Sequence, residues 1–127
     1  MPPESLALII VDHGSRREES NELLLKVVAE YRGSRDFAIV EPAHMELAEP
    51  SIATAVDRCA EQGAKLIVVF PYFLSPGRHW RHDIPSLTEE AVAEHEGLRF
   101  VVTAPFGMHP LMSEVIDQRV AAAIDGE

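Results

Sequence analysis

The chain has 127 residues, of which 46% are hydrophobic, and this is the length and apolar content of one domain, residues 1–127. Its formal net charge of −10 disfavours nucleic-acid binding, because nucleic-acid binders normally present a basic surface. No apolar run approaches the roughly 20 residues of a membrane span. A single cysteine, Cys59, excludes an internal disulfide and suits a reducing compartment. Because the N-terminus also lacks a basic leader segment, we expect a cytoplasmic protein without membrane association.

Strand and helix patterns alternate along the first part of the chain. Residues 6–11 form a continuous apolar run, which is typical of a strand buried on both faces. Apolar side chains recur at helical spacing over residues 18–32, and Gly33 is the expected end of this helix. Residues 37–40 form a second short strand that we expect to end at Pro42.

The same alternation continues to the C-terminus. The predicted bounds are residues 50–63 for a helix, 66–70 for a strand, 71–83 for a long loop, 85–94 for a helix and 100–103 for a strand. His109 and Pro110 begin a last helix. The apolar face of this helix has five members, namely Leu111, Met112, Val115, Ile116 and Val120. We expect this face to pack on the sheet, like those of the other helices.

This alternation predicts an α/β fold, a flavodoxin-like three-layer sandwich with a four-stranded parallel sheet in the order 2-1-3-4 and helices on both faces. In that order the first and third strands are neighbours, and the chain leaves them toward opposite faces. Ligands of such sheets bind in the crevice at this switch point. We therefore expect the loops after these two strands to carry the chemistry.

Three loops at the predicted carboxyl edge of the sheet contain residues that can bind metal or transfer protons. His13 follows the first strand, Glu46 follows the second and His79 follows the third. Neutral imidazole is a common ligand of iron, cobalt, nickel and zinc, and a carboxylate can complete such a set. The placement therefore predicts a divalent metal site that contains His13 and His79.

The loop sequences resemble those of a known family. They read His-Gly-Ser-Arg at residues 13–16, Met-Glu-Leu-Ala-Glu-Pro at residues 45–50 and Pro-Tyr-Phe-Leu-Ser-Pro-Gly-Arg-His-Trp-Arg-His-Asp-Ile-Pro at residues 71–85. With these segments the chain resembles the sirohydrochlorin chelatases, the class II tetrapyrrole chelatases of the CbiX/SirB type, over nearly its whole length.

The resemblance implies ATP-independent insertion of Fe²⁺ or Co²⁺ into sirohydrochlorin, a polycarboxylate tetrapyrrole, in sirohaem or cobalamin biosynthesis. It implies that His13 and His79 bind the metal and assist the reaction, with Glu46 as a third participant. The metal is a substrate, and no tightly bound cofactor is expected. The resemblance also implies a homodimer of single-domain chains that face each other across a cleft. Asp12 matches a subgroup similar to plant sirohaem ferrochelatases, which favours iron, but their cysteine-rich tail is absent and no iron–sulfur cluster is expected.

Metal insertion replaces two pyrrole protons, so the site must hold the ion, accept protons and hold the ring. His13 and His79 can ligate the ion and act as bases near neutral pH, while Glu46 can take a proton or balance charge. The substrate carboxylates are expected to meet the start of the first helix and a set of polar side chains. This set comprises Ser15, Arg16, Arg17, Arg78 and Arg81.

Each candidate site residue can also have a purely structural role. His13 and His79 can be turn residues, and Glu46 can be a solvated or helix-capping carboxylate. The other candidates are His44 (packing or capping), His82 (rim or ligand), His95 (solvated), His109 (turn or cleft), Cys59 (core) and Trp80 (stacking on a ring or packing a dimer).

Two other functions compete with the chelatase interpretation. The same fold could be a non-catalytic carrier of a metal or tetrapyrrole. Phosphoryl transfer through His13 is the third hypothesis, but histidine phosphatases have an arginine directly before this histidine, where Asp12 stands here. Affinity trends do not select among iron, cobalt and nickel.

Overall fold

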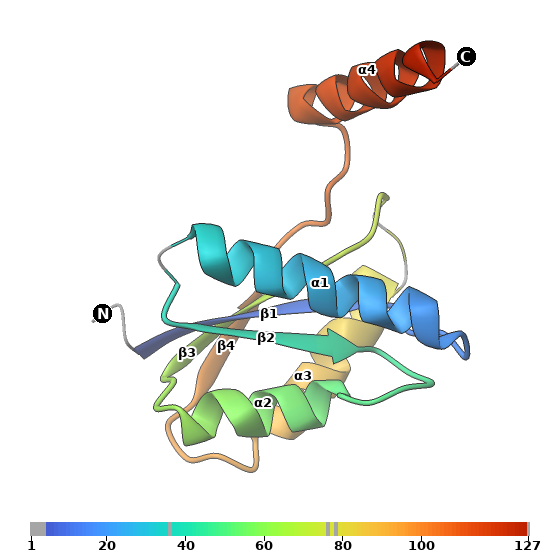
Figure 1. Ribbon diagram of the computed structural model, residues 1–127. Coiled ribbons are helices and arrows are strands. Elements are labelled where there is room, and N and C mark those ends of the chain that lie inside the picture. The colour runs from blue at the N-terminus through green and yellow to red at the C-terminus, as the bar shows by residue number, and fades with distance from the viewer. Residues whose placement is uncertain (1–4, 36, 76, 78, 127) are drawn as a thin grey trace.

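One parallel sheet of four strands forms the centre of the molecule, in the order β2-β1-β3-β4 (Figure 1). The computed structural model describes residues 5–35, 37–75, 77 and 79–126, apart from the side chains of His79 and Trp80. The strands are β1 (Leu6–Asp12), β2 (Ile39–His44), β3 (Leu66–Pro71) and β4 (Arg99–Val102). The predicted order is confirmed, and β1 pairs with β3 as well as with β2.

Helices cover both faces of the sheet. The covering helices are α1 (Glu18–Ser34), α2 (Ile52–Glu61) and α3 (Ile84–Val92), while a π-helical turn η2 (His79–Asp83) precedes α3 and α4 (Pro110–Asp125) ends the chain. Figure 1 shows α1 on one face and α2 with α3 on the other, so the three-layer architecture is confirmed. Within the part of the chain that the structure describes, no helix is long and apolar enough to cross a bilayer.

Two apolar clusters build the core, one on each face. Alternate residues of β1 supply both, because successive side chains of a strand point to opposite faces. Ile9 and its neighbours at alternate positions pack under α2 and α3, while Leu8 and Ile10 pack against Leu24 and Val28 of α1. The second cluster is the smaller, and several aromatic side chains around it are only partly buried.

Two predicted element ends are wrong. Strand β2 continues through Pro42 to His44, because β2 lies at the sheet edge and pairs only with β1, and an edge strand tolerates a missing N–H on its open side. Helix α1 continues past Gly33 to Ser34 and ends at Arg35, whose backbone is extended. Gly33 therefore lies inside the last turn and does not end the helix.

The C-terminal half shows two further differences from the predictions. The predicted loop over residues 71–83 is partly helical, because η2 leads directly into α3. Helix α4 forms where it was predicted, but its apolar face does not pack on the sheet, and none of its residues is buried. Figure 1 shows α4 projecting away from the sheet at the end of an extended segment.

Candidate functional site

Backbone hydrogen bonds join three loops at the carboxyl edge of the sheet, beyond the ends of the strands. The N–H of Met45 donates to the carbonyl of Asp12 at 2.9 Å, and the N–H of Glu46 donates to the carbonyl of His13 at 3.1 Å. On the other side of β1, the N–H of Tyr72 donates to the carbonyl of Val11 at 2.7 Å. The loops after β1, β2 and β3 therefore meet at one edge, as the strand order predicts.

Gly14 allows the close approach of the first two loops. Its φ is 92°, a left-handed conformation that residues with a side chain rarely adopt. A Cβ atom at this position would lie 1.8 Å from the carbonyl oxygen of Glu46 and 3.3 Å from the Cβ of His44. Only glycine fits here, which explains the His-Gly sequence by backbone geometry.

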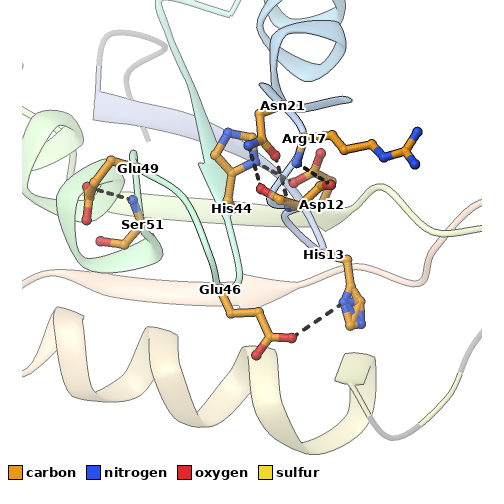
Figure 2. A network of polar contacts seen from close by, with 9 residues as sticks. Asp12, His13, Arg17, Asn21, His44, Glu46, Glu49 and Ser51 are labelled. Carbon is orange, nitrogen blue, oxygen red and sulfur yellow. Dashed lines mark hydrogen bonds and ion pairs between the residues drawn. The ribbon is translucent and has the colours of Figure 1, made fainter. Parts of the chain in front are cut away.

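His13 and Glu46 form the polar pair of this edge. The Nδ1 atom of His13 lies 4.0 Å from Oε1 of Glu46, and the two side chains are 46% and 55% exposed (Figure 2). The ring of Phe73, from the loop after β3, lies 5.8 Å from the imidazole ring. An imidazole and a carboxylate at this distance can ligate one ion together or share the transfer of a proton.

Two cavities border this pair. One, of about 280 Å³, is lined by His13, Ser15 and Phe73 among others. The other, of about 380 Å³, is lined by Glu46, Asp83 and residues of α3. Each member of the pair therefore borders a cavity of its own.

A hydrogen-bonded pair, one buried histidine and one partly buried aspartate, lies at the base of these loops. His44 is 1% exposed, and its Nδ1 lies 2.6 Å from Oδ1 of Asp12, so the ring and the carboxylate are hydrogen-bonded (Figure 2). The expectation that His44 packs is confirmed, but its pairing with Asp12 was missed. Asp12 and His44 are the last residues of β1 and β2 and are partners in register. Extending β2 past Pro42 would have revealed the pair from the sequence.

The imidazole of His44 has one further feature. Its Nε2 atom is buried and has no hydrogen-bond partner among the described residues. An unpaired buried nitrogen is unfavourable, so the pairing with Asp12 and the packing under Gly14 must hold the ring in place. We assign His44 to the support of the loops and not to ligand binding.

The loop that carries Glu46 is also fixed at its far end. The hydroxyl of Thr54 and the N–H of Ser51 both donate to Glu49 at 2.8 and 3.0 Å, and these bonds lower the pKa of the Glu49 carboxyl. Leu47, next to Glu46, has a φ of 70°, which is unusual for a bulky side chain. The loop is therefore held at both ends around a strained residue.

Ser15 has a structural role at the start of α1. Its N–H donates to Oδ1 of Asn21 at 3.0 Å, and its carbonyl accepts from Nδ2 of Asn21 at 2.7 Å. Its hydroxyl accepts from the N–H of Arg17 at 3.0 Å. Glu18 and Glu19 occupy the first turn of the helix, and their charges lower the attraction of this helix end for a substrate carboxylate.

The predicted arginines follow β1 and β3 in the chain. Arg16 and Arg17 after β1 are exposed, and Arg81 in η2 is exposed as well. Arg78 lies outside the described residues, as do the side chains of His79 and Trp80. The backbone of η2 begins at His79 and follows β3, but the meeting of its imidazole with His13 stays a prediction.

Other candidate residues have structural places. His109 caps α4, because its Nδ1 accepts from the N–H of Leu111 at 3.2 Å. His82 is exposed in η2. His95 was expected to be only solvated, and this is wrong, because its Nε2 pairs with Oδ1 of Asp57 at 2.7 Å. Cys59 belongs to the core as predicted, and burial raises the pKa of its thiol to about 12.

Among the residues that the structure describes, no three histidine, cysteine, aspartate or glutamate side chains are close enough to hold an ion. The pair of His13 and Glu46 can contribute at most two ligands, and its role as part of a metal site stays a prediction. A further ligand has to come from another group, and the predicted one is the His79 imidazole.

Comparison with known proteins identifies close relatives. The sequence model of the family described as CbiX matches residues 7–123. The chloroplastic sirohydrochlorin ferrochelatase of Arabidopsis thaliana is 54% identical over 113 residues, which cover 89% of this chain and 50% of that protein. The chain thus spans about half the length of this relative.

Solved structures share the fold over most of this chain. A CbiX protein of Marinobacter aquaeolei, described as a putative cobalamin biosynthesis protein, is 33% identical with a TM-score of 0.80, over 96% of this chain and 99% of that chain. The cobalt complex of sirohydrochlorin chelatase SirB from Bacillus subtilis subspecies spizizenii is 26% identical with a TM-score of 0.86, over 93% of this chain and 50% of that chain.

Proposed function

Since the chain belongs to the CbiX family, we propose that it inserts a divalent metal ion, Fe²⁺ or Co²⁺, into sirohydrochlorin without ATP. The observation that carries this proposal is that backbone hydrogen bonds between two loops hold His13 and Glu46 close together at the carboxyl edge of the sheet. The relatives named above as a ferrochelatase and as a chelatase with bound cobalt support the substrate and the choice of metals. Iron is favoured by the higher identity to the plant enzyme.

The proposed roles follow from the chemistry of insertion. His13 and His79 ligate the incoming ion, and Glu46 receives a pyrrole proton or balances the charge of the ion. Because His13 and Glu46 lie 4.0 Å apart, a proton can pass to the carboxylate after a small movement of either side chain.

The substrate is held by its carboxylates. The guanidinium groups of Arg16, Arg17 and Arg81, with that of Arg78, offer charge-assisted hydrogen bonds, and the exposure of the first three suits a large ring. Ser15 contributes to substrate binding mainly by fixing the loop, because its hydroxyl already accepts a hydrogen bond from the N–H of Arg17.

The oligomer and the location are further parts of the proposal. The exposed positions of His13 and Glu46 favour a second copy that covers the edge and excludes water, so we propose a homodimer of chelatase-type domains spanning residues 1–127. The single cysteine and the acidic charge favour a cytoplasmic location without nucleic-acid or membrane partners.

The test is an anaerobic insertion assay with sirohydrochlorin and each of Fe²⁺, Co²⁺ and Ni²⁺. We expect the absorption spectrum of the ring to change faster with the protein than without it, for many equivalents per chain. No acceleration with any of the three metals would refute the proposal. Product that stops at one equivalent per chain would indicate a carrier instead.

Variants of the pair test the roles of the residues. His13→Ala and Glu46→Gln should each lower the rate by about 100-fold, because each removes a group that acts on the metal or the proton. His95→Ala is the control, since His95 pairs with Asp57 and belongs to none of the loops at the carboxyl edge. Equal rates in the His13→Ala variant and the control would contradict the assigned role.

A further inference from the structure

Leu47, in the loop after β2, has a backbone conformation that suits a different residue. Its φ is 70°, in the left-handed region that glycine adopts freely and that a bulky L-residue adopts only with strain. The other described residues with a positive φ are glycines, namely Gly14, Gly63, Gly97 and Gly107. Leucine at residue 47 therefore destabilises the chain relative to a residue that accepts this conformation.

Packing inside the chain does not offset this strain. Leu47 is 57% exposed, and it belongs to neither of the two apolar clusters that form the core. An apolar side chain stabilises a protein when it is removed from water, so an exposed leucine contributes little. Strained residues cluster at binding and catalytic sites, where the surrounding structure fixes them. We therefore looked for a ligand that would cover this side chain.

The loop holds Leu47 in one place before any ligand binds. The N–H of His44 donates to the carbonyl of Pro50 at 2.7 Å, and His44 pairs with Ser51 in an isolated bridge, so residues 45–49 form a closed loop. The residue before Leu47 is fixed as well, because the N–H of Glu46 donates to the carbonyl of the preceding loop. A side chain that is ordered in advance loses little conformational entropy when it contacts a ligand.

Leu47 lies next to the polar pair of the candidate site. It follows Glu46 directly, so their Cα atoms are about 3.8 Å apart, and the Glu46 carboxylate lies 4.0 Å from the His13 imidazole. Apolar side chains also line the cavities that this pair borders, and they include Leu23, Met45, Phe73 and Leu87. The surroundings of the pair therefore suit a ligand that combines a metal-binding centre with an apolar surface.

We propose that the side chain of Leu47 packs on the face of the sirohydrochlorin ring and sets the affinity of the chain for the metal-free substrate. The ion must enter the centre of the ring from one face, because the four pyrrole nitrogens occupy the ring plane. The groups that deliver it, His13 and Glu46, therefore point at that face, and a side chain fixed beside Glu46 contacts the same face. The identity of the ring rests on the proposed function, to which this inference adds the contact.

Leu47→Asn separates this contact from the strain. Asparagine has the branched shape of leucine and tolerates the left-handed region, but it is polar. We expect the affinity for metal-free sirohydrochlorin, measured by the fluorescence of the ring, to fall about tenfold. The Tm should equal or exceed that of the wild type, because strain is relieved. Leu47→Met keeps an apolar side chain and should bind within about twofold of the wild type.

Leu25→Asn is the matched control, since Leu25 is 43% exposed but lies in the regular backbone of α1. It should leave the affinity unchanged and lower the Tm, because asparagine is a poorer helix former than leucine. Equal affinities of the wild type and Leu47→Asn would overturn the proposal. So would a larger fall in Tm for Leu47→Asn than for the control, which would show that Leu47 packs within its own chain.

Two further measurements complete the test. A loss of affinity in Leu47→Asn that is accompanied by a lower mass in light scattering would assign the leucine to a contact between copies and overturn the proposal. If this variant fails to fold by circular dichroism, Leu47→Gly, which removes both the side chain and the strain, decides by the same affinity measurement.

Binding and insertion are measured separately, so the contact and the proposed function can fail separately. Ring binding that is weakened in Leu47→Asn, without insertion by the wild type, would support the contact and refute the insertion. Insertion by the wild type with the same KM for sirohydrochlorin in Leu47→Asn would refute the contact alone. A wild-type chain that does not bind the ring would overturn both.

Discussion

Replacement of Gly14 by alanine should both destabilise the protein and disrupt its candidate site. An L-residue in the left-handed region costs about 1–2 kcal/mol. The new Cβ would lie 1.8 Å from the carbonyl oxygen of Glu46, and ordinary contact begins at 3.4 Å, so the two loops must separate by about 1.6 Å. That movement breaks the hydrogen bond from Glu46 to His13, worth about 1 kcal/mol. The expected loss of unfolding free energy is about 2–4 kcal/mol, or about 10 °C in Tm.

Gly63→Ala is the matched control for this substitution. Gly63 has a φ of 95°, almost the same as Gly14, but no atom lies within 4 Å of an added Cβ. It should therefore lose only the backbone contribution, about 1–2 kcal/mol. Thermal unfolding measures both variants, and the insertion assay should show a loss of about 100-fold for Gly14→Ala alone, because the reacting groups move apart. Equal Tm values for the two variants would refute the argument that the clash with Glu46 matters.

Two further predictions concern buried polar and thiol groups. His44→Ala removes the partner of the Asp12 carboxylate and leaves a cavity, so we expect a loss of about 3–5 kcal/mol in chemical denaturation, against less than about 1 kcal/mol for His95→Ala, whose pair with an aspartate is exposed. Similar losses in the two variants would contradict the supporting role of His44. Cys59 should not react with iodoacetamide at pH 8 in the folded protein, since burial raises the pKa of its thiol to about 12, and should react within minutes in denaturant. Rapid labelling of the folded protein would contradict the burial.

The elements that were predicted well are those whose residues are buried along the whole length of the element. The run at residues 6–11 was identified because β1 is central in the sheet and buried on both faces. The end of β2 was missed, since a proline normally ends a strand and only its place at the sheet edge permits it here. The pairing of His95 with Asp57 was missed because the two residues are far apart in the sequence.

The candidate site, too, was predicted only in part. The presence of His13 and Glu46 after neighbouring strands followed from the strand order, and their 4.0 Å separation is consistent with it. The pairing of Asp12 with the buried His44 was not identified, because it depends on the register of two strands and on the true end of the second.

By itself, the sequence determined the α/β class and the chemical character of the loops, because these depend on local periodicity and on residue types next to each strand, while the strand order followed from the usual arrangement of chains in which strands and helices alternate. Only the tertiary structure decided that Gly14 lets one loop touch another, and that α4 leaves the sheet it was expected to cover. Both depend on hydrogen bonds between distant segments, such as those from residues 106 and 107 to residues 73 and 74, and local patterns do not encode these contacts.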